Sequence, residues 1–295
     1  MPANNQTSDA SGQWERLLPA EFQRRFDALP AVFLPLGTVE WHGLHNALGL
    51  DALKAQALCL RAADRAGGGI VHPPLYGGMG GLDKPATVVI EPEMAWENYL
   101  LRPWLEKLCS EFHRHGFAAI LMLTGHYGHN QQIVVREVAA RMTERLQIPV
   151  LGVPEYWLAL DGGYHGDHAG IGETSLMMYL HPELVAMDRI KADPDYGADE
   201  KIAKGASVEL GRKYAELIID RLARLARSMP HWDASSRAAY VRAERAIIWA
   251  QVTGWRTQSP WFAWRKLASG PLARYGELLI EMRFDQIERA ASELL

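Results

Sequence analysis

The chain has few cysteines, little excess charge and no long hydrophobic run. Its two cysteines, Cys59 and Cys109, lie in apolar stretches of helical character, so we expect buried thiols and neither a disulfide nor a thiolate metal site. The formal net charge is −4 and no dense stripe of lysine and arginine occurs, which argues against nucleic acid as a partner. No segment approaches the roughly 20 apolar residues of a membrane span. Residues 1–12 are polar and predict a disordered lead-in without a signal core. We therefore expect a cytoplasmic protein with no membrane partner.

Two catalytic signatures are also absent. No Gly-x-Ser-x-Gly elbow occurs, which argues against a serine hydrolase. Residues 76–81 are rich in glycine, but no Lys-Ser/Thr pair follows them and no Gly-x-Gly-x-x-Gly turn opens a helix. We expect this loop to form a flexible wall above strand ends, not a phosphate cradle.

Composition and patterning predict a folded α/β protein. The chain is 48% hydrophobic and 22% charged, as is typical of globular domains. Continuous apolar runs, which are typical of buried parallel strands, alternate with helical patterns. The expected strands are residues 31–36, 70–75, 88–90, 117–123 and 148–153, and the expected helices are residues 14–29, 52–66, 93–115, 131–146 and 202–229, with a further helix ending at residue 180.

The first motif follows the strand at residues 31–36 and contains four potential metal ligands, Glu40, His42, His45 and Asp51. Glu40 and His42 are separated by one residue, so in an extended segment both side chains point the same way. Ligands bind at strand ends in α/β sheets, although a solvated polar loop is the simpler interpretation. Asp51 directly precedes the expected helix 52–66 and could be only its N-cap.

A second motif, Thr124-Gly-His126-Tyr-Gly-His129-Asn, follows the buried strand 117–123. A lone histidine in a loop is usually structural. Right-handed crossovers, however, place the loops of successive parallel strands at one edge of the sheet. We therefore expect His126 to meet the residues of the first motif.

A third motif places His165, Asp167, His168 and Glu173 just before a helix. Such a site favours anions, so Glu173 could be there only to complement the helix dipole. Trp157, which follows the strand 148–153, is either an aromatic wall for a small substrate or a core residue.

These motifs, in this order, resemble the creatininase (creatinine amidohydrolase) family over residues 31–187. The resemblance implies a three-layer α/β/α sandwich with a mostly parallel sheet and a two-metal site above the strand ends. Carried over by motif, Glu40, Asp51 and His126 hold one metal, while His42 holds the second and Asp51 bridges both.

The sequence also departs from the family pattern. Founding members have a ligand Glu two residues after the Gly-His histidine, where this chain has Gly128. Relatives without that Glu carry the His-Ala-Gly…Glu-Thr-Ser carboxylate, so the role passes to Glu173. The extra histidine of this chain, His129, is an alternative ligand.

The residues and the resemblance together predict chemistry. Imidazole and carboxylate donors suit Zn, Mn or Fe, and two such ions per subunit can bridge a hydroxide that attacks a carbonyl. His168 and Glu173 are the expected catalytic residues, with His168 positioning the carbonyl or carrying the proton to the leaving nitrogen. The expected substrate-binding residues are Tyr127, His129, Trp157 and Tyr164.

We therefore expect a metal-dependent amidohydrolase that cleaves a C–N bond of a small-molecule substrate. The expected bond is that of a cyclic amide. Two alternatives remain open. One is a metal-dependent peptidase or deformylase acting in cofactor maturation, and the other is a non-catalytic scaffold that the metal stabilises.

Residues 231–295 lie beyond the resemblance and carry five tryptophans, Trp232, Trp249, Trp255, Trp261 and Trp264. We expect a catalytic domain at residues 13–230 and a helical extension at residues 231–295 that packs on this domain or on a neighbouring subunit. The family often forms hexamers, so a homo-oligomer is expected.

Overall fold

The protein is described from a computed structural model, over residues 12–81, 84–92, 100–190, 203–257 and 270–293. A parallel sheet of four strands forms its centre within these residues, in the order β2-β1-β3-β4. The strands are β1 (Ala31–Leu36), β2 (Ile70–Val71), β3 (Ala119–Thr124) and β4 (Val150–Pro154). β1 pairs with β3 along its whole length, from Ala31 opposite Ala119 to Leu36 opposite Thr124.

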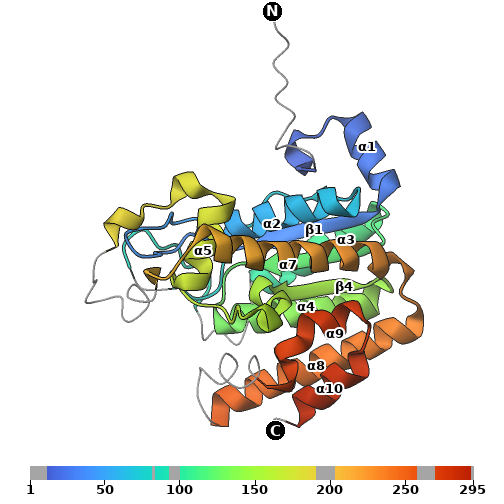
Figure 1. Cartoon of the computed structure of the whole chain (residues 1–295). Coiled ribbons are helices and arrows are strands. Elements are labelled where there is room, and N and C mark those ends of the chain that lie inside the picture. Colours follow the sequence, from blue (N-terminus) through green and yellow to red (C-terminus); the bar gives the residue numbers. More distant parts are fainter. Residues whose placement is uncertain (1–11, 82–83, 93–99, 191–202, 258–269, 294–295) are drawn as a thin grey trace, which may run out of the picture.

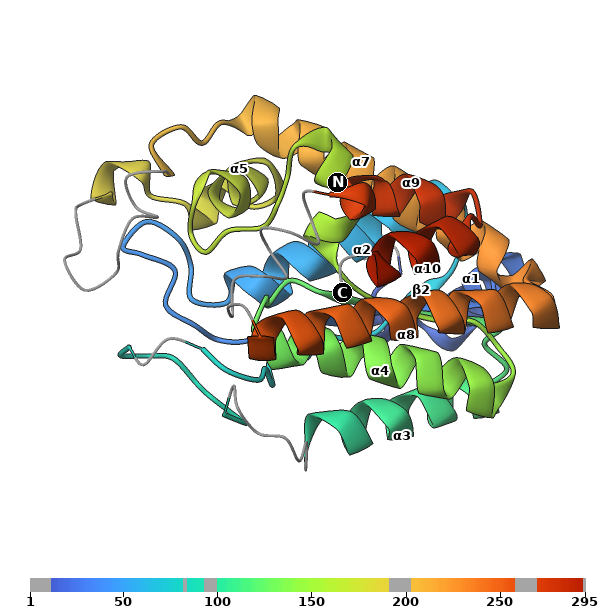
Figure 2. The same ribbon diagram turned by 90° about the horizontal axis from the view of Figure 1, so that it is seen from below.

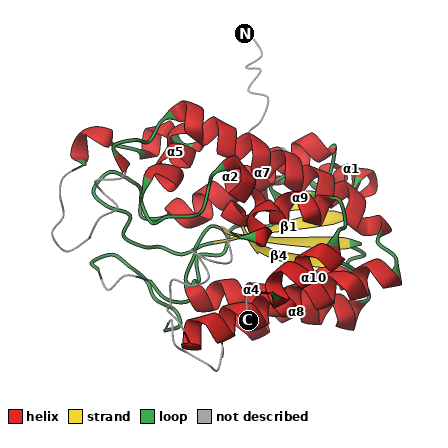
Figure 3. Ribbon diagram, turned by 60° about the horizontal axis from the view of Figure 1, so that its bottom comes forward, coloured by secondary structure: helices red, strands yellow, loops and turns green. Residues whose placement is uncertain are grey.

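Helices cover both faces of the sheet (Figure 3). One face lies against α2 (Leu50–Ala66), which packs in turn on α7 (Val208–Ser228), the partner of α5 (Ile171–Leu180). The other face lies against α3 (Leu101–Arg114) and α4 (His129–Leu146). Side chains alternate between the faces because strand residues point alternately to either side. Phe33 and Leu121 therefore join the first core cluster, whereas Leu34 and Met122 join the second. The expected α/β sandwich is confirmed.

Two expected elements differ in extent, and prolines account for both differences. The expected helix 14–29 is divided into a 3₁₀ turn (Trp14–Arg16) and α1 (Pro19–Ala28), because Pro19 takes the first helical position, where its missing N–H is not needed. The expected strand 70–75 pairs regularly only at β2. Pro73 and Pro74 have no N–H to donate, and Leu75 forms an isolated bridge to Leu36.

The expected strand 88–90 is not formed, because these residues contribute only an isolated bridge from Val88 to Val39. The other expected elements keep their type with small changes at their ends. Of the expected helix 93–115, residues 93–99 lie outside the described part, and Pro103 falls in the first turn of α3. Further short 3₁₀ turns in the described residues are Glu155–Leu158, Leu160–Gly162, Pro182–Leu184, Met187–Arg189, Met229–His231 and Pro271–Arg274.

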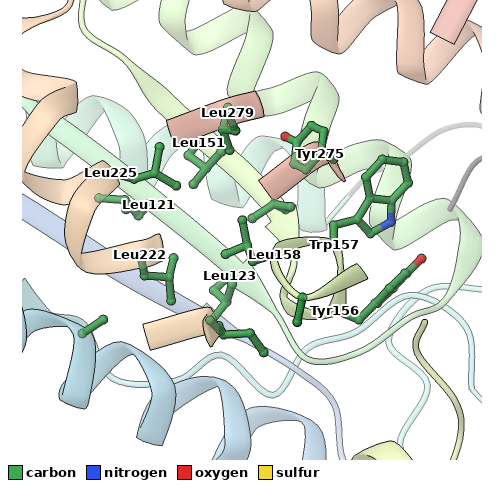
Figure 4. Packing of buried hydrophobic residues seen from close by; sticks show 14 of the residues in the cluster. Leu121, Leu123, Leu151, Tyr156, Trp157, Leu158, Leu222, Leu225, Tyr275 and Leu279 are labelled. Carbon is green, nitrogen blue, oxygen red and sulfur yellow. The ribbon is translucent and has the colours of Figure 1, made fainter. Parts of the chain in front are cut away.

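The C-terminal helices lie beside α4 and α7 (Figures 1 and 2). They are α8 (Ala234–Thr257), α9 (Tyr275–Ile280) and α10 (Phe284–Ser292), and α8 lies along α4. Arg136 of α4 and Glu244 of α8 form a fully buried ion pair at 2.6 Å. The Tyr275 ring meets the Trp157 ring edge-on at 5.1 Å (Figure 4). Two of the five tryptophans of this region, Trp261 and Trp264, lie outside the described residues. Residues 1–11 of the expected lead-in also lie outside them. No described helix is long and apolar enough to cross a membrane.

Two glycines at strand ends allow the start of α2 to lie directly against the sheet. A Cβ atom at Gly37 would lie 2.2 Å from Ala52 N, and one at Gly125 would lie 2.1 Å from Asp51 O. Neither distance is tolerable for a carbon atom, so these positions require glycine. The close approach brings the first turn of α2 to the carboxyl ends of β1 and β3.

We expect Gly125→Ala to destabilise the protein by roughly 1–3 kcal/mol, because the added methyl group overpacks a site formed by backbone. Urea unfolding at equilibrium measures the change. Gly77→Ala is the matched control, since its Cβ would meet Trp104 at an ordinary 3.5 Å. An equal loss in both variants would refute the packing argument.

Candidate metal centre

Asp51 lies at the centre of the site, and the N-cap interpretation of this residue is wrong. The N-cap of α2 is Gly49, and Asp51 is the second residue inside the helix. Its carboxylate instead faces two imidazoles, with Oδ1 at 3.1 Å from His42 Nε2 and Oδ2 at 3.1 Å from His126 Nδ1. One oxygen is therefore directed to each histidine.

Three overlapping groups of side chains meet at this point. Within each group the potential ligand atoms lie within 4.8 Å of one another. The groups are Glu40, Asp51 and His126; His42, Asp51 and Glu173; and Glu40, His42 and His168. All the residues predicted as metal ligands are thus brought together from the ends of β1 and β3 and the starts of α2 and α5.

Backbone carbonyls fix the orientation of both central imidazoles. His42 Nδ1–H donates to Glu40 O at 3.0 Å, and His126 Nε2–H donates to Met79 O at 2.9 Å. Each ring therefore turns its other nitrogen to the carboxylates, as metal-binding histidines do when a second group holds the remote N–H. His45, the fourth candidate of the first motif, instead meets Thr174 Oγ1 at 3.1 Å.

The charges of the buried groups are strongly coupled. Burial alone lowers the pKa of His42, but the Asp51 carboxylate outweighs it and raises this pKa to about 9. Burial raises the pKa of Asp51, and the two imidazoles hold it far below its usual range despite this. Carboxylates that are buried close together are stabilised by positive charge between them, which a divalent cation can supply. The mixed oxygen and nitrogen donors suit Zn, Mn or Fe.

Glu173 is held at the first turn of α5 by two other residues. Its Oε2 accepts the Ala169 N–H at 2.8 Å and lies 3.8 Å from His42 Nε2, and its Oε1 contacts Lys54 Nζ. Asp167 accepts the N–H groups of Gly172 and Glu173 at 2.6 and 3.0 Å and so anchors the start of the helix. Glu173 therefore does more than complement the helix dipole.

Lys54 and Glu155 belong to the site but were not predicted. Both are fully buried, and their charges lie 3.0 Å apart. Burial lowers the pKa of Lys54, but the carboxylates of Glu155 and Glu173 outweigh it and raise this pKa above its usual range. The available signal was the spacing, because Lys54 follows Asp51 by three positions and so shares its helix face.

The other predicted site residues fall into two sets. His168 lies beside His42, with 4.5 Å between ring centroids, and Tyr127 and Tyr164 share a 2.6 Å hydrogen bond next to Lys54. Trp157 is fully buried in the core under the Arg136 guanidinium, and His129 stacks on Trp255 of α8 at 5.5 Å. The described ligand groups do not include His129, and the substrate-binding roles of these residues stay predictions.

Comparison with known proteins agrees with the site. Residues 15–226 match the creatininase family model, described as creatinine amidohydrolase. The chain is 30% identical over 201 residues to creatinine amidohydrolase of Pseudomonas putida, which covers 59% of this chain and 74% of that protein. It is 26% identical over 231 residues to the mycofactocin precursor peptide peptidase of Mycobacterium ulcerans (strain Agy99), covering 68% and 86% respectively.

Solved structures show the same fold. A crystal structure of creatinine amidohydrolase (creatininase) has a TM-score of 0.60 at 24% identity and covers 75% of this chain and 99% of that one. A structure named creatininase Mn has a TM-score of 0.58 at 26% identity, covering 75% and 99%. A variant creatininase described as Zn-Zn type has a TM-score of 0.58 at 24% identity, covering 74% and 98%.

The fold and the ligand cluster define a parallel α/β protein with a candidate metal centre at the carboxyl edge of its sheet. The chain belongs to the creatininase family and is an amidohydrolase.

We expect Asp51→Asn to lower metal content strongly, because each of its oxygens faces one ligand group. Metal per chain after dialysis against Zn²⁺ or Mn²⁺ measures this. Asp64→Asn on the same helix is the control, since Asp64 is largely exposed and pairs with Arg25 instead. Full metal content in Asp51→Asn would contradict the central role of Asp51.

Burial lowers the pKa of His129 to about 4. The folded state then binds this proton less readily than the unfolded state, so stability is lost as pH falls from about 6.5 to about 4. Relative to His129→Phe, which keeps the aromatic stack, we expect the wild type to lose about 3 kcal/mol over this interval. Urea unfolding at several pH values tests this, and parallel pH profiles of the two proteins would refute it.

Proposed function

We propose that the protein hydrolyses a C–N bond of a small molecule, in a cyclic amide, with two divalent ions per subunit. The observation that supports the proposal is the Asp51 carboxylate, which turns one oxygen to each of two groups of ligand atoms. A bridging carboxylate of this kind is typical of two-metal hydrolytic sites.

The ligand groups suggest how the ions would be held. Glu40, Asp51 and His126 would bind one ion, and His42, Asp51 and Glu173 would bind the other. Bound ions of this type polarise a carbonyl group and lower the pKa of water towards about 7, which supplies a nucleophile at neutral pH.

His168 is the proposed proton carrier. Its Nε2–H donates to Trp41 O at 2.9 Å, which leaves the lone pair on Nδ1. Burial lowers the pKa of His168, which favours the neutral ring that can accept a proton. A proton taken up at Nδ1 can then pass to the departing nitrogen.

A peptide C–N bond is the second candidate substrate. The relative named as a mycofactocin precursor peptide peptidase supports it, because the similarity covers 86% of that protein. The chemistry is the same in both cases, since a lactam and a peptide each present a carbonyl carbon bonded to nitrogen. A cytoplasmic location and a homo-oligomeric state remain predictions.

Activity towards a panel of lactams, formamides and short peptides, measured with Zn²⁺ and with Mn²⁺, separates the candidates. We expect turnover of at least one cyclic amide, its loss on removal of metal with a chelator and its return when the metal is restored. Cleavage of peptides alone would favour the second candidate, and hydrolysis that survives complete metal removal would overturn the proposal.

We expect His168→Gln to lower kcat by about 10²–10⁴-fold while both ions stay bound, because a proton carrier contributes to the rate and not to metal affinity. Metal analysis and steady-state kinetics on the same sample test this. Loss of an ion would instead identify His168 as a ligand through its group with Glu40 and His42.

A further inference from the structure

The Lys54 ammonium is held by three acceptors. It lies on α2, three residues after Asp51, and is fully buried. Its Nζ contacts Glu173 Oε1, Glu155 Oε1 at 3.0 Å and Tyr127 OH at 2.9 Å. Two of these contacts are hydrogen bonds and the third is an ion pair, so the ammonium is held from three sides.

The fixed ammonium determines how Glu173 presents its carboxylate. Because Oε1 is bound by Lys54, the other oxygen is turned to the Ala169 N–H and towards His42 Nε2. Rotation of the carboxylate would break the contact with a buried cation, which is costly where no water can replace it. Lys54 and Ala169 thus hold the carboxylate from opposite ends.

We propose that Lys54 is a positioning residue that holds Glu173 in place as a ligand of the His42-side ion. The proposal rests on the two-ion function proposed above. This chain has Gly128 and so offers no carboxylate directly after His126 at the end of β3. Glu173 has to reach the cluster from a different helix, and Lys54 fixes it there.

The positive charge of Lys54 would also repel a nearby metal ion, which opposes its effect on the orientation of Glu173. Glu155 reduces this repulsion. The Glu155 carboxylate lies 3.0 Å from Nζ, in an equally buried place, and the Tyr127 hydroxyl donates to it. The negative charge of Glu155 offsets the positive charge of Lys54, with which it forms an ion pair. The main effect of Lys54 on the site is then its hydrogen bond to Glu173. Replacing Lys54 and Glu155 together removes this hydrogen bond, so we expect weaker metal binding.

The test replaces both charges together, because a single substitution would leave one buried charge uncompensated. Zn²⁺ and Mn²⁺ titrations at pH 8, followed by calorimetry and by metal analysis, compare the wild type with Lys54→Met/Glu155→Gln. We expect the wild type to bind two ions. The variant keeps one ion at unchanged affinity and binds the other about 10–100-fold more weakly, as is usual when a residue that orients a ligand is lost.

Two further variants separate orientation from general destabilisation. Lys54→Gln/Glu155→Gln restores an N–H donor without the charge and is expected to recover part of the lost affinity. It also serves as the test variant if the methionine variant does not fold. Arg136→Met/Glu244→Gln removes the other fully buried ion pair, between α4 and α8, and is expected to keep both ions. Thermal unfolding followed by circular dichroism confirms that each variant is folded.

If Lys54→Met/Glu155→Gln binds the second ion as tightly as the wild type, or more tightly, the positioning role of Lys54 is wrong. An equal loss of metal affinity in the Arg136→Met/Glu244→Gln control would also overturn it. Failure of the wild type itself to bind two ions would instead overturn the proposed two-ion function.

Discussion

The buried carboxylate of Asp51 is the group on which the rest of the site depends. A charge this deep is stable only if opposite charge or strong donors surround it. The two strand ends supply imidazoles on either side, and the first turn of α2 adds its positive dipole end. Gly37 and Gly125 serve the same requirement, because only glycine lets the helix start so close to the sheet. Fold and site are therefore parts of one packing arrangement.

Much of this arrangement could be predicted from the sequence. Glu40, His42 and His126 each follow a continuous apolar run, and the carboxyl ends of parallel strands meet at one edge. The order of strands and polar loops was therefore enough to bring these ligands together. Asp51 and Glu173 were ambiguous, because a carboxylate at a helix start is common without any metal. Only the contacts of their oxygens distinguish the two interpretations.

The remaining residues depend on partners that are distant in the chain. Lys54 resembles an ordinary helix lysine until Glu155, about a hundred residues later, is placed beside it. The stacking of His129 requires Trp255 from α8, and Trp157 is enclosed by Arg136 and Tyr275. Local patterns contain no information about such partners, so neither the role of Lys54 nor the packing of His129 and Trp157 could be predicted. The expected helix 14–29 and the expected strand 70–75 differ from the structure for a simpler reason, the missing N–H of proline.

The C-terminal helices have a consequence for the sheet itself. β4 is the last strand of the described sheet, yet all five of its residues are buried. Leu279 of α9 and Leu151 of β4 belong to one hydrophobic cluster (Figure 4). A bare edge strand invites pairing with other chains and aggregation. The family match ends at residue 226, before α8, so side chains from beyond the match help to bury the residues of this edge strand.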